Sequence, residues 1–183
     1  HENIRERMTY AEELQFLGEH ELRNKFLAGL LMHLPGNTLC LYQLVEKHGK
    51  PLYEEVMKSQ EEGFFDDKLR KVFFIYGNTS TTERERIRSV VEGEKNSITI
   101  ASYGTFSTGI NIRNIHNIVL ASPSKSRIRV LQSIGRGLRQ GENKDSVLIF
   151  DIADDLTFRH QSNFTLNHFQ ERINIYNAEQ FNY

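Results

Sequence analysis

The sequence contains little cysteine and no long hydrophobic run. Its 183 residues include one cysteine, Cys40, so a disulfide bond within the chain is excluded. Cys40 lies in an apolar run, which predicts a buried strand residue of an intracellular protein. Hydrophobic stretches stay well short of the ~18–20 residues that a membrane-spanning helix needs, and the first residues lack the pattern of a secretory signal peptide. We therefore expect a cytoplasmic domain with no membrane partner.

Proline, low-complexity sequence and internal repeats are also scarce. The chain has three prolines and no Pro/Gly-rich linker, which favours one continuous domain. Its contents of 38% hydrophobic and 26% charged residues are typical of globular proteins. A chain of this length buries roughly 70% of the surface that its unfolded form exposes. Because the sequence opens with His-Glu-Asn rather than Met, we expect it to be a piece of a longer protein.

Acidic residues are absent from one long segment. The net charge of the chain is −1, yet Asp and Glu do not occur between Lys95 and Gly141. The basic residues of this segment are Lys95, Arg113, Lys125, Arg127, Arg129, Arg136 and Arg139. The segment therefore carries +7 and the remainder of the chain carries −8. A solvated positive face would explain this pattern, but the length of the acid-free segment favours a polyanionic partner.

Hydrophobic runs rich in Val, Ile, Leu and Phe alternate with helix-like stretches. The runs lack clean polar alternation, as expected of strands that are buried on both faces of a parallel sheet. Strand alternating with helix at these lengths predicts an α/β fold with helices on both faces of the sheet. The predicted strands are Thr38–Tyr42, Val72–Tyr76, Ser97–Ser102, Asn117–Ala121 and Ser146–Ile152, and the predicted helices are Pro51–Glu62, Thr82–Glu92 and Lys125–Leu138.

Two flanks lie outside this α/β core. Leucine and phenylalanine recur between residues 9 and 34, which predicts one or two amphipathic helices before the first strand. The tail from Gln161 to Tyr183 has apolar residues at near-helical spacing. We therefore divide the chain into a helical flank at 1–34, a core at 35–158 and a helical extension at 159–183, and we expect both flanks to serve packing.

The sharpest functional signal is the segment Gln132–Gln140. On a helical wheel, Arg129, Gln132, Arg136 and Arg139 fall within an arc of about 80°, beside an arc of apolar residues. Two glycines in the segment each weaken a helix by about 1 kcal/mol, but they let another surface approach closely. The guanidinium is always charged, and its planar fork matches phosphate oxygens. This helix face therefore predicts a phosphate site. The alternative is a surface helix whose arginines form salt bridges, in which the two glycines would have no role.

A second signal lies about 25 residues before the arginine helix. Ile98–Asn111 runs from a buried strand into a segment with many hydroxyl side chains and two glycines, which we interpret as a loop. In a parallel sheet, ligands bind beyond the carboxyl ends of the strands. A loop of this kind can bind phosphate without reading bases. Its composition alone is also typical of an ordinary turn.

A weaker signal follows the first predicted strand. Pro51 suits the first turn of a helix. This would put His48, Gly49 and Lys50 at a helix N-terminus, where an anion could bind. A plain junction between strand and helix explains the same residues equally well.

Other polar patterns are interpreted as structural. In Tyr76–Arg86, a Ser/Thr cap precedes Glu-rich helix residues, and Arg84 is expected to have a structural role. Asp151, Asp154 and Asp155 suggest a metal site, but no set of ligands completes it, and a polar turn after a strand is the preferred interpretation. The seven histidines form no zinc pattern. We therefore predict no metal held by this chain.

These segments occur in the order of the conserved motifs of superfamily 2 helicases, which the chain resembles. The arginine segment resembles motif VI, whose arginines reach an ATP γ-phosphate across a domain interface. The resemblance implies that Arg136 and Arg139 act as arginine fingers, with Gln132 beside them in the nucleotide site. Arginine fingers stabilise charge on the transferred phosphoryl group and accelerate other NTPases by roughly 10³–10⁵.

The segment after the third predicted strand resembles motif V, which contacts the nucleic-acid backbone and the nucleotide. The resemblance implies that Ser102 and Thr105 contact backbone phosphates and that Gly109 and Asn111 face the nucleotide. The residues after the first two strands resemble motif IV and the glycine-plus-Glu-Arg element that follows it. Together with the basic segment, this resemblance adds further candidates for nucleic-acid binding, namely His48, Lys50, Lys125 and Arg127.

Beyond the motifs, the chain resembles the phage UvsW-type recombination helicases. The similarity includes Ala101–Gly109, Val130–Gln132 and Phe181–Tyr183. It implies a RecA-like parallel sheet that forms the second motor domain of a DNA helicase or translocase in a bacterial or phage-infected cell. The implied substrates are single-stranded, forked or branched DNA, or an RNA–DNA hybrid. The implied internal partner is the first RecA-like domain of the same polypeptide.

A complete motor needs a phosphate-binding Gly-x-x-x-x-Gly-Lys-[Ser/Thr] loop and a carboxylate pair for Mg²⁺. Neither pattern occurs in this sequence. We therefore expect ATP and Mg²⁺ to be held mainly by the first domain, and the chain alone to be inactive as an ATPase. The alternatives are a non-catalytic nucleic-acid-binding module and the motor lobe of a nuclease-linked duplex translocase.

Overall fold

The computed structural model describes residues 7–63, 69–109, 112–122, 126, 135 and 146–180. Within these ranges, no helix has the length and hydrophobicity that would let it cross a bilayer.

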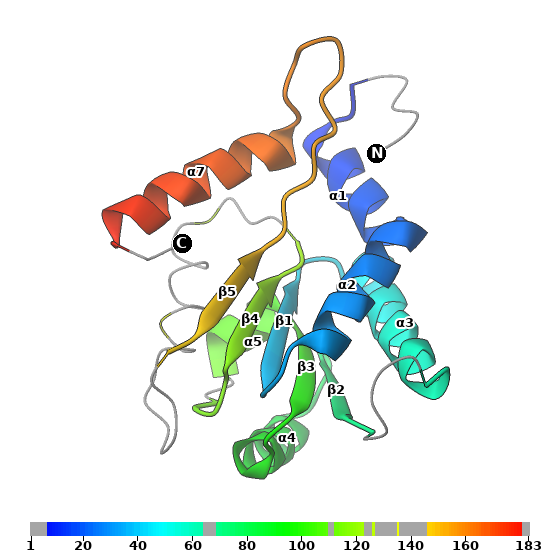
Figure 1. Ribbon diagram of the computed structural model, residues 1–183, viewed down its shortest axis with the longest axis vertical. Coiled ribbons are helices and arrows are strands. Elements are labelled where there is room, and N and C mark those ends of the chain that lie inside the picture. The colour runs from blue at the N-terminus through cyan, green and yellow to red at the C-terminus, as the bar shows by residue number, and fades with distance from the viewer. Residues whose placement is uncertain are drawn as a thin grey trace.

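A five-stranded sheet forms the centre of the molecule (Figure 1). The strand order is β2-β3-β1-β4-β5, and every neighbouring pair is parallel. All residues of the three central strands are buried, which explains why their sequences lack polar alternation. The prediction of an α/β fold with a parallel sheet is confirmed. The strands are β1 (Thr38–Tyr42), β2 (Lys71–Ile75), β3 (Ser97–Ser102), β4 (Asn117–Leu120) and β5 (Leu148–Asp151).

Helices connect and flank the strands, and several begin at caps that are visible in the sequence. Thr9 and Glu12 form a capping box at the start of α1. Ser80 accepts the backbone N–H of Glu83 at the start of α4, and a proline occupies the first turn of α3. The helical elements are α1 (Tyr10–Glu19), α2 (Glu21–His33), the π-helical turn η1 (Val45–Gly49), α3 (Lys50–Glu61), α4 (Thr81–Gly93), α5 (Tyr103–Gly109) and α7 (Phe164–Ala178).

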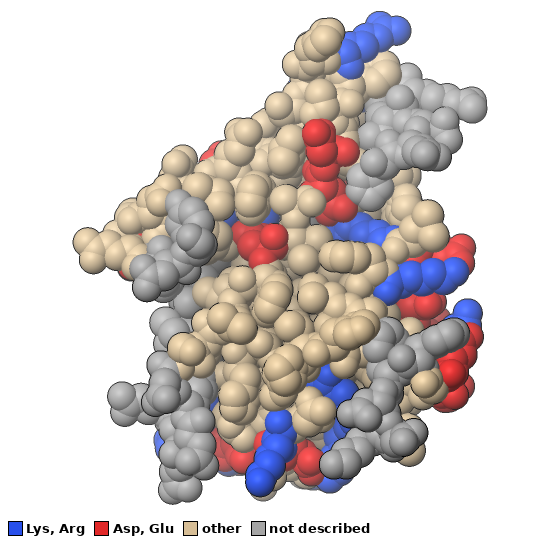
Figure 2. Space-filling model, in the orientation of Figure 1, with Lys and Arg blue, Asp and Glu red and all other residues tan. Residues whose placement is uncertain are grey.

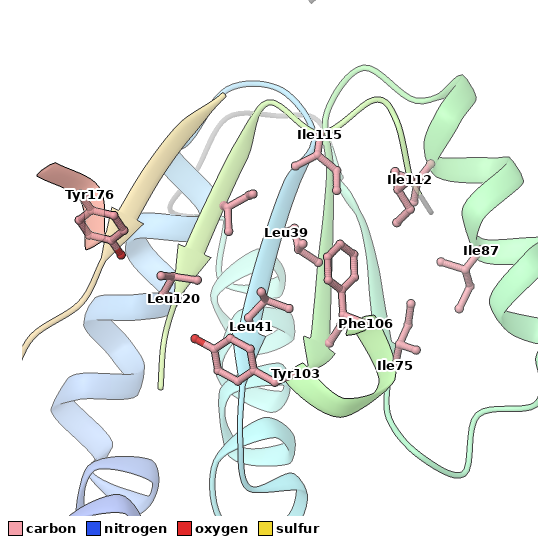
Figure 3. Packing of buried hydrophobic residues seen from close by; sticks show 13 residues of the cluster. Leu39, Leu41, Ile75, Ile87, Tyr103, Phe106, Ile112, Ile115, Leu120 and Tyr176 are labelled. Atoms are coloured by element: carbon pink, nitrogen blue, oxygen red, sulfur yellow. The ribbon is translucent and has the colours of Figure 1, made fainter. Parts of the chain in front are cut away.

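One face of the sheet is covered by α4, α5 and α7 (Figure 3). The core on this face joins Leu41 of β1 to Ile87 of α4, Phe106 of α5 and Tyr176 of α7. Leu41 and Phe106 are completely buried, and each fully buried side chain of this size contributes roughly 1.5–3 kcal/mol. The C-terminal helix α7 is therefore part of the hydrophobic core.

The opposite face is covered by α2 and α3. Leu31 of α2 and Leu52 of α3 belong to one core cluster with Cys40 of β1. Cys40 is a buried strand residue, as predicted, and burial raises the pKa of its thiol to about 12. The helices cover the edge strand β5 less completely, and its Leu148 is 59% exposed. Figure 2 shows an uncharged surface over this part of β4 and β5, with charged side chains gathered below it and to its right.

The predicted and observed elements agree within two residues at most ends. The β1 and β3 strands match their predicted bounds, and β2 and α3 are shifted by one residue. The predicted helix Lys125–Leu138 lies outside the described residues, except for positions 126 and 135. The helical flanks are confirmed as helices, with α1 and α2 before the sheet and α7 after it. The helix α2 packs against one face of the sheet. The predicted domain boundary at residue 35 therefore separates elements that pack together.

Candidate nucleic-acid interface

A groove of about 540 Å³ lies where β1, β2 and β3 end. Parallel strands place their carboxyl ends at one edge of the sheet, which is where α/β proteins bind ligands. The segments that follow β2 and β3, which the sequence marked separately, therefore meet in one place. The residues that line the groove are Gln43, Val45, Gly77, Arg84, Ser102, Tyr103, Gly104 and Thr105.

Ser102 and Thr105 lie at the start of α5 and contact each other. Their hydroxyl oxygens are 2.7 Å apart, and Ser102 Oγ accepts the backbone N–H of Thr105 at 3.3 Å. This bond has the spacing of a serine N-cap. Both residues line the groove, and they are only 8% and 4% exposed. The site therefore has two neighbouring hydroxyls whose positions are fixed by their own hydrogen bonds.

The prediction of a loop after β3 was wrong, because the chain forms the helix α5 there. Ser, Thr and Gly have low helix propensity, which is why their composition predicts a turn. Tertiary packing overrides that preference, since Tyr103 and Phe106 of this helix are buried in the core. The Ser102 cap then satisfies a backbone donor that would otherwise lack a partner.

Arg84 of α4 reaches back to the turn that follows β2. Its Nη2 donates to the carbonyl oxygens of Gly77 at 2.9 Å and Tyr76 at 3.5 Å. Within the described part of the chain, its Nε is buried without a hydrogen-bond partner. Arg84 therefore fixes the turn, in keeping with the structural role predicted for it, and also adds positive charge to the groove wall.

Ser122, just beyond the end of β4, joins several elements at the same edge. Its Oγ accepts the backbone N–H of Gln43 at 3.1 Å and lies 2.8 Å from His48 Nδ1. Its carbonyl oxygen accepts the hydroxyl of Tyr103 at 2.9 Å. Burial raises the pKa of Tyr103, so this phenol remains a hydrogen-bond donor. The ends of β1 and β4, the π-helical turn η1 and the start of α5 are thus held in one network.

His48 is a buried part of this network, since its exposed fraction is 2%. Burial, together with the charge of Arg23, lowers the pKa of His48 to about 3. The imidazole is therefore neutral at pH 7. In the described part of the chain its Nε2 has no hydrogen-bond partner.

The expected anion site at the helix N-terminus around residues 48–50 does not form. The backbone N–H groups of His48 and Gly49 both donate to Leu44 O, at 3.0 and 2.9 Å. The N–H of Lys50 donates to Val45 O. The π-helical turn η1 runs directly into α3, so these donors lie inside a continuous helical segment rather than at a free helix end.

Lys50 itself points to the surface. Its Nζ lies 2.7 Å from Glu46 Oε2, and this hydrogen bond raises the pKa of the lysine. Because both side chains are substantially exposed, the pair contributes little stability. The ammonium group can therefore exchange this carboxylate for another anion.

The three aspartates considered as metal ligands each have a structural partner. Asp151 binds Arg172 of α7 at 2.7 Å, and Asp154 binds Arg23 of α2 at 2.9 Å. Asp155 accepts the backbone N–H of residue 157 at 2.8 Å. Within the described ranges, no cluster of three His, Cys, Asp or Glu side chains is arranged to hold a metal ion.

Of the other predicted site residues, one lies within the described part of the chain. Gly109 is the last residue of α5. The candidates that lie outside the described residues are Asn111, Lys125, Arg127, Gln132, Arg136 and Arg139.

Sequence reasoning missed several residues of the groove. Gln43, Gly77 and Gly104 line it, and none of them was singled out as a ligand. Each follows a strand by one or two residues, and such positions in a parallel sheet share one edge. Applying that rule to every strand, rather than to one motif at a time, would have identified them.

Comparison with known proteins gives consistent matches. A family model described as the helicase conserved C-terminal domain matches residues 23–141. The ATP-dependent DNA helicase uvsW of Enterobacteria phage T4 is 33% identical over 188 residues, covering 96% of this chain and 36% of that protein. The crystal structure of T4 UvsW matches with a TM-score of 0.72 and 33% identity, covering 94% of this chain and 35% of the other.

A more distant structure shares the fold alone. The C-terminal domain of the DEAD-box protein Dbp5 matches with a TM-score of 0.61 at 17% identity, covering 88% of this chain and 82% of the other. The present chain therefore corresponds to about a third of the phage protein and to most of an isolated C-terminal domain.

Proposed function

This chain belongs to the family of helicase conserved C-terminal domains, and we propose that within a longer protein it is the second motor lobe of an ATP-dependent DNA helicase or translocase. Its relatives include a protein named an ATP-dependent DNA helicase. We propose the same class of activity here, on forked DNA, Holliday junctions or R-loops.

The observation that carries this proposal is the groove at the carboxyl ends of β1, β2 and β3. It presents the paired hydroxyls of Ser102 and Thr105 beside the guanidinium of Arg84. Hydroxyls and guanidinium groups donate to phosphate oxygens, and they do so without distinguishing bases. Such a surface suits the sugar–phosphate backbone of a single strand, which a motor must hold whatever its sequence.

Lysine and arginine side chains would extend this surface. We propose that Lys125 and Arg127, together with exposed Lys50, make further phosphate contacts. We assign His48 a structural role instead, because its ring is buried and bonded to Ser122.

The nucleotide side of the proposal rests on the motif VI resemblance. Arg136 and Arg139 would reach the γ-phosphate of ATP, with Gln132 beside them and with Gly109 and Asn111 near the nucleotide. ATP and Mg²⁺ would be held mainly by the first lobe, because this sequence lacks the phosphate-binding loop. Two guanidinium groups aimed at the transferred phosphoryl group would stabilise the charge that develops on it.

The motor cycle follows from these two contacts. ATP held by the first lobe draws the arginines of this lobe inward and closes the cleft between them. Hydrolysis weakens that attraction, and the lobes separate. Because each lobe also binds the backbone, alternate closing and opening would advance the protein along a strand.

The test uses the full-length protein with Arg136→Ala and Arg139→Ala. Each variant should bind a DNA oligonucleotide as the wild type does but lose DNA-stimulated ATP hydrolysis, by on the order of 10³-fold if the finger role is correct. Arg159→Ala, at an exposed position of the same lobe, is the matched control and should hydrolyse ATP normally. Unaltered turnover in both finger variants would reject the assignment.

A further inference from the structure

A carboxylate of α1, near the N-terminal end of the described chain, caps the helix α7 near its C-terminal end. Glu13 of α1 is 1% exposed. Its Oε1 accepts the backbone N–H of Phe164 and its Oε2 that of Thr165, both at 2.9 Å. These are first-turn amides of α7, which lack partners inside their own helix. Within the described residues, Asn163 at the N-cap of α7 makes no capping bond with its side chain, so α7 depends on α1 for its cap.

Aromatic contacts reinforce this junction. The ring of Tyr10 meets that of His168 edge to face at 5.0 Å and that of Phe164 at 6.4 Å. The guanidinium of Arg7 lies 5.4 Å from the centre of the Phe164 ring and donates to Gln161 Oε1 at 3.0 Å. The first turn of α1 and the first two turns of α7 therefore form one packed unit, although about 150 residues separate them.

A second connection ties α2 to the carboxyl end of β4. Arg23 Nε lies 3.0 and 2.9 Å from the two carboxylate oxygens of Asp154, and its Nη2 donates to Ala121 O at 2.7 Å. Both charged side chains are buried. Removing one partner of such a pair leaves the other charge buried and uncompensated, so breaking this connection is strongly unfavourable.

A third connection ties α7 to the carboxyl end of β5. Arg172 donates to both oxygens of Asp151, at 2.7 and 2.8 Å, and the Tyr176 hydroxyl donates to Asp151 Oδ2 at 2.7 Å. Asp151 is the last residue of β5. In Figure 1, α7 and α1 lie on either side of the segment that leaves β5.

We propose that these three connections form a strut, made of Glu13, Arg23, Asp151, Asp154 and Arg172, that holds α1 in a fixed position relative to the carboxyl ends of β4 and β5. In the sequence, β4 and β5 directly bracket the segment that carries the two proposed arginine fingers. The inference rests on the proposed function: in a second lobe that follows the first along the polypeptide, α1 would be the helix that receives the connection from the first lobe. Because the strut is rigid, a movement of the first lobe would be transmitted through α1 to this edge of the sheet. A flexible junction would absorb the same movement. Glu13 is then a positioning residue for the coupling of ATP hydrolysis to strand movement.

The experiment compares two rates in the full-length protein, DNA-stimulated ATP hydrolysis and strand separation on a forked duplex. Glu13→Ala should keep most of its hydrolysis but separate at least about fivefold fewer base pairs per ATP, the lower end of typical coupling effects. Glu13→Gln, which keeps an acceptor oxygen for one amide, should fall between this variant and the wild type. Glu21→Gln removes an exposed charge from α2 and should leave the ratio unchanged.

Amide hydrogen exchange at Phe164 and Thr165 gives a readout that does not depend on the motor. Exchange there should become faster in Glu13→Ala than in the wild type. A proportional fall of both rates in Glu13→Ala, or unaltered exchange at these amides, would overturn the strut. A wild-type protein without DNA-stimulated hydrolysis would instead overturn the proposed function.

Discussion

At both ends of the sheet's strands, single polar side chains connect neighbouring elements through hydrogen bonds. Ser122 bonds to the backbone of Gln43, to His48 and to Tyr103. Arg70, just before β2, donates to the carbonyl oxygens of Leu31 and four other residues near the opposite edge. Buried groups of this kind cost free energy when they lose a partner, by about 1–3 kcal/mol for a neutral group. They therefore specify one arrangement of the elements.

His48 makes stability depend on pH. Its folded pKa is about 3, below the ordinary value of 6.5, so below pH 6.5 the unfolded chain binds a proton that the folded chain does not. The free energy of unfolding should therefore fall as pH falls from about 6.5 toward 3, by up to about 1.4 kcal/mol per pH unit from this group. Above pH 7 the contribution should be constant.

Urea denaturation at pH 7.5, 6.5 and 5.5 measures this dependence. His48→Gln should be less stable than the wild type at pH 7.5, because it disturbs the bond to Ser122, but should lose less stability on acidification. His33→Gln, at an exposed position of α2, should behave as the wild type. Equal losses in His48→Gln and the wild type would show that this ring is not the titrating group.

At the scale of elements, the regular ones were predictable and the irregular ones were not. The strands β1 and β3 follow from hydrophobic runs of the right length, and the α4 helix follows from the cap at Ser80. The π-helical turn η1 and the short helix α5 were missed, because packing against the core determines both. Glu13 could not be identified as a cap, because the amides that it binds lie about 150 residues away. More of the site was predictable, since Ser102 was named from its motif and Gln43 directly follows a strand. The place of Arg84 in the groove wall was not, because it depends on how α4 packs against the turn after β2.

The start of α5 makes a testable contribution to binding. Thr105→Val removes a hydroxyl from the groove at nearly constant shape, and Ser102→Ala removes both a hydroxyl and the helix cap. Each should weaken the binding of single-stranded DNA by the full-length protein about fivefold to tenfold, which corresponds to one lost hydrogen bond. Ser102→Ala should also lower the free energy of unfolding by about 1 kcal/mol.

Fluorescence anisotropy with two oligonucleotides of different base composition measures these affinities. Both variants should weaken the two complexes equally, because backbone contacts do not read sequence. Ser89→Ala on the exposed side of α4 serves as the control. Loss of affinity for only one of the oligonucleotides would argue against a backbone contact.

At the scale of the whole molecule, charge is divided unevenly. The acid-free segment carries +7 within a chain of net charge −1, so the positive charge that would attract a polyanion is concentrated in one region. The chain also corresponds to about a third of the phage helicase that it resembles. Both facts fit the proposed role of this chain as a second lobe that binds a polyanion and acts together with a first lobe.

Salt dependence tests the charge argument. Affinity of the full-length protein for single-stranded DNA should fall linearly on a plot of log K against log salt concentration. Lys125→Gln should reduce the slope by about 0.7, the value for one phosphate contact with a single strand. Lys25→Gln removes a lysine that binds Glu21 on α2 and should leave the slope as it is. An unchanged slope in Lys125→Gln would exclude that contact.

The position of β1 in the centre of the sheet governs how the protein can form during its synthesis. Thr38 of β1 pairs with Ile98 of β3 and with Asn117 of β4. The first strand to be synthesised therefore pairs only with strands that are synthesised much later. A ribosome-bound chain that ends before residue 97 has no neighbouring strand for β1, so both backbone edges of this strand remain unpaired. Non-local pairing of this kind is slow and leaves unfinished chains prone to aggregation. Nascent chains of this protein should therefore need protection from chaperones until β3 and β4 have left the exit tunnel.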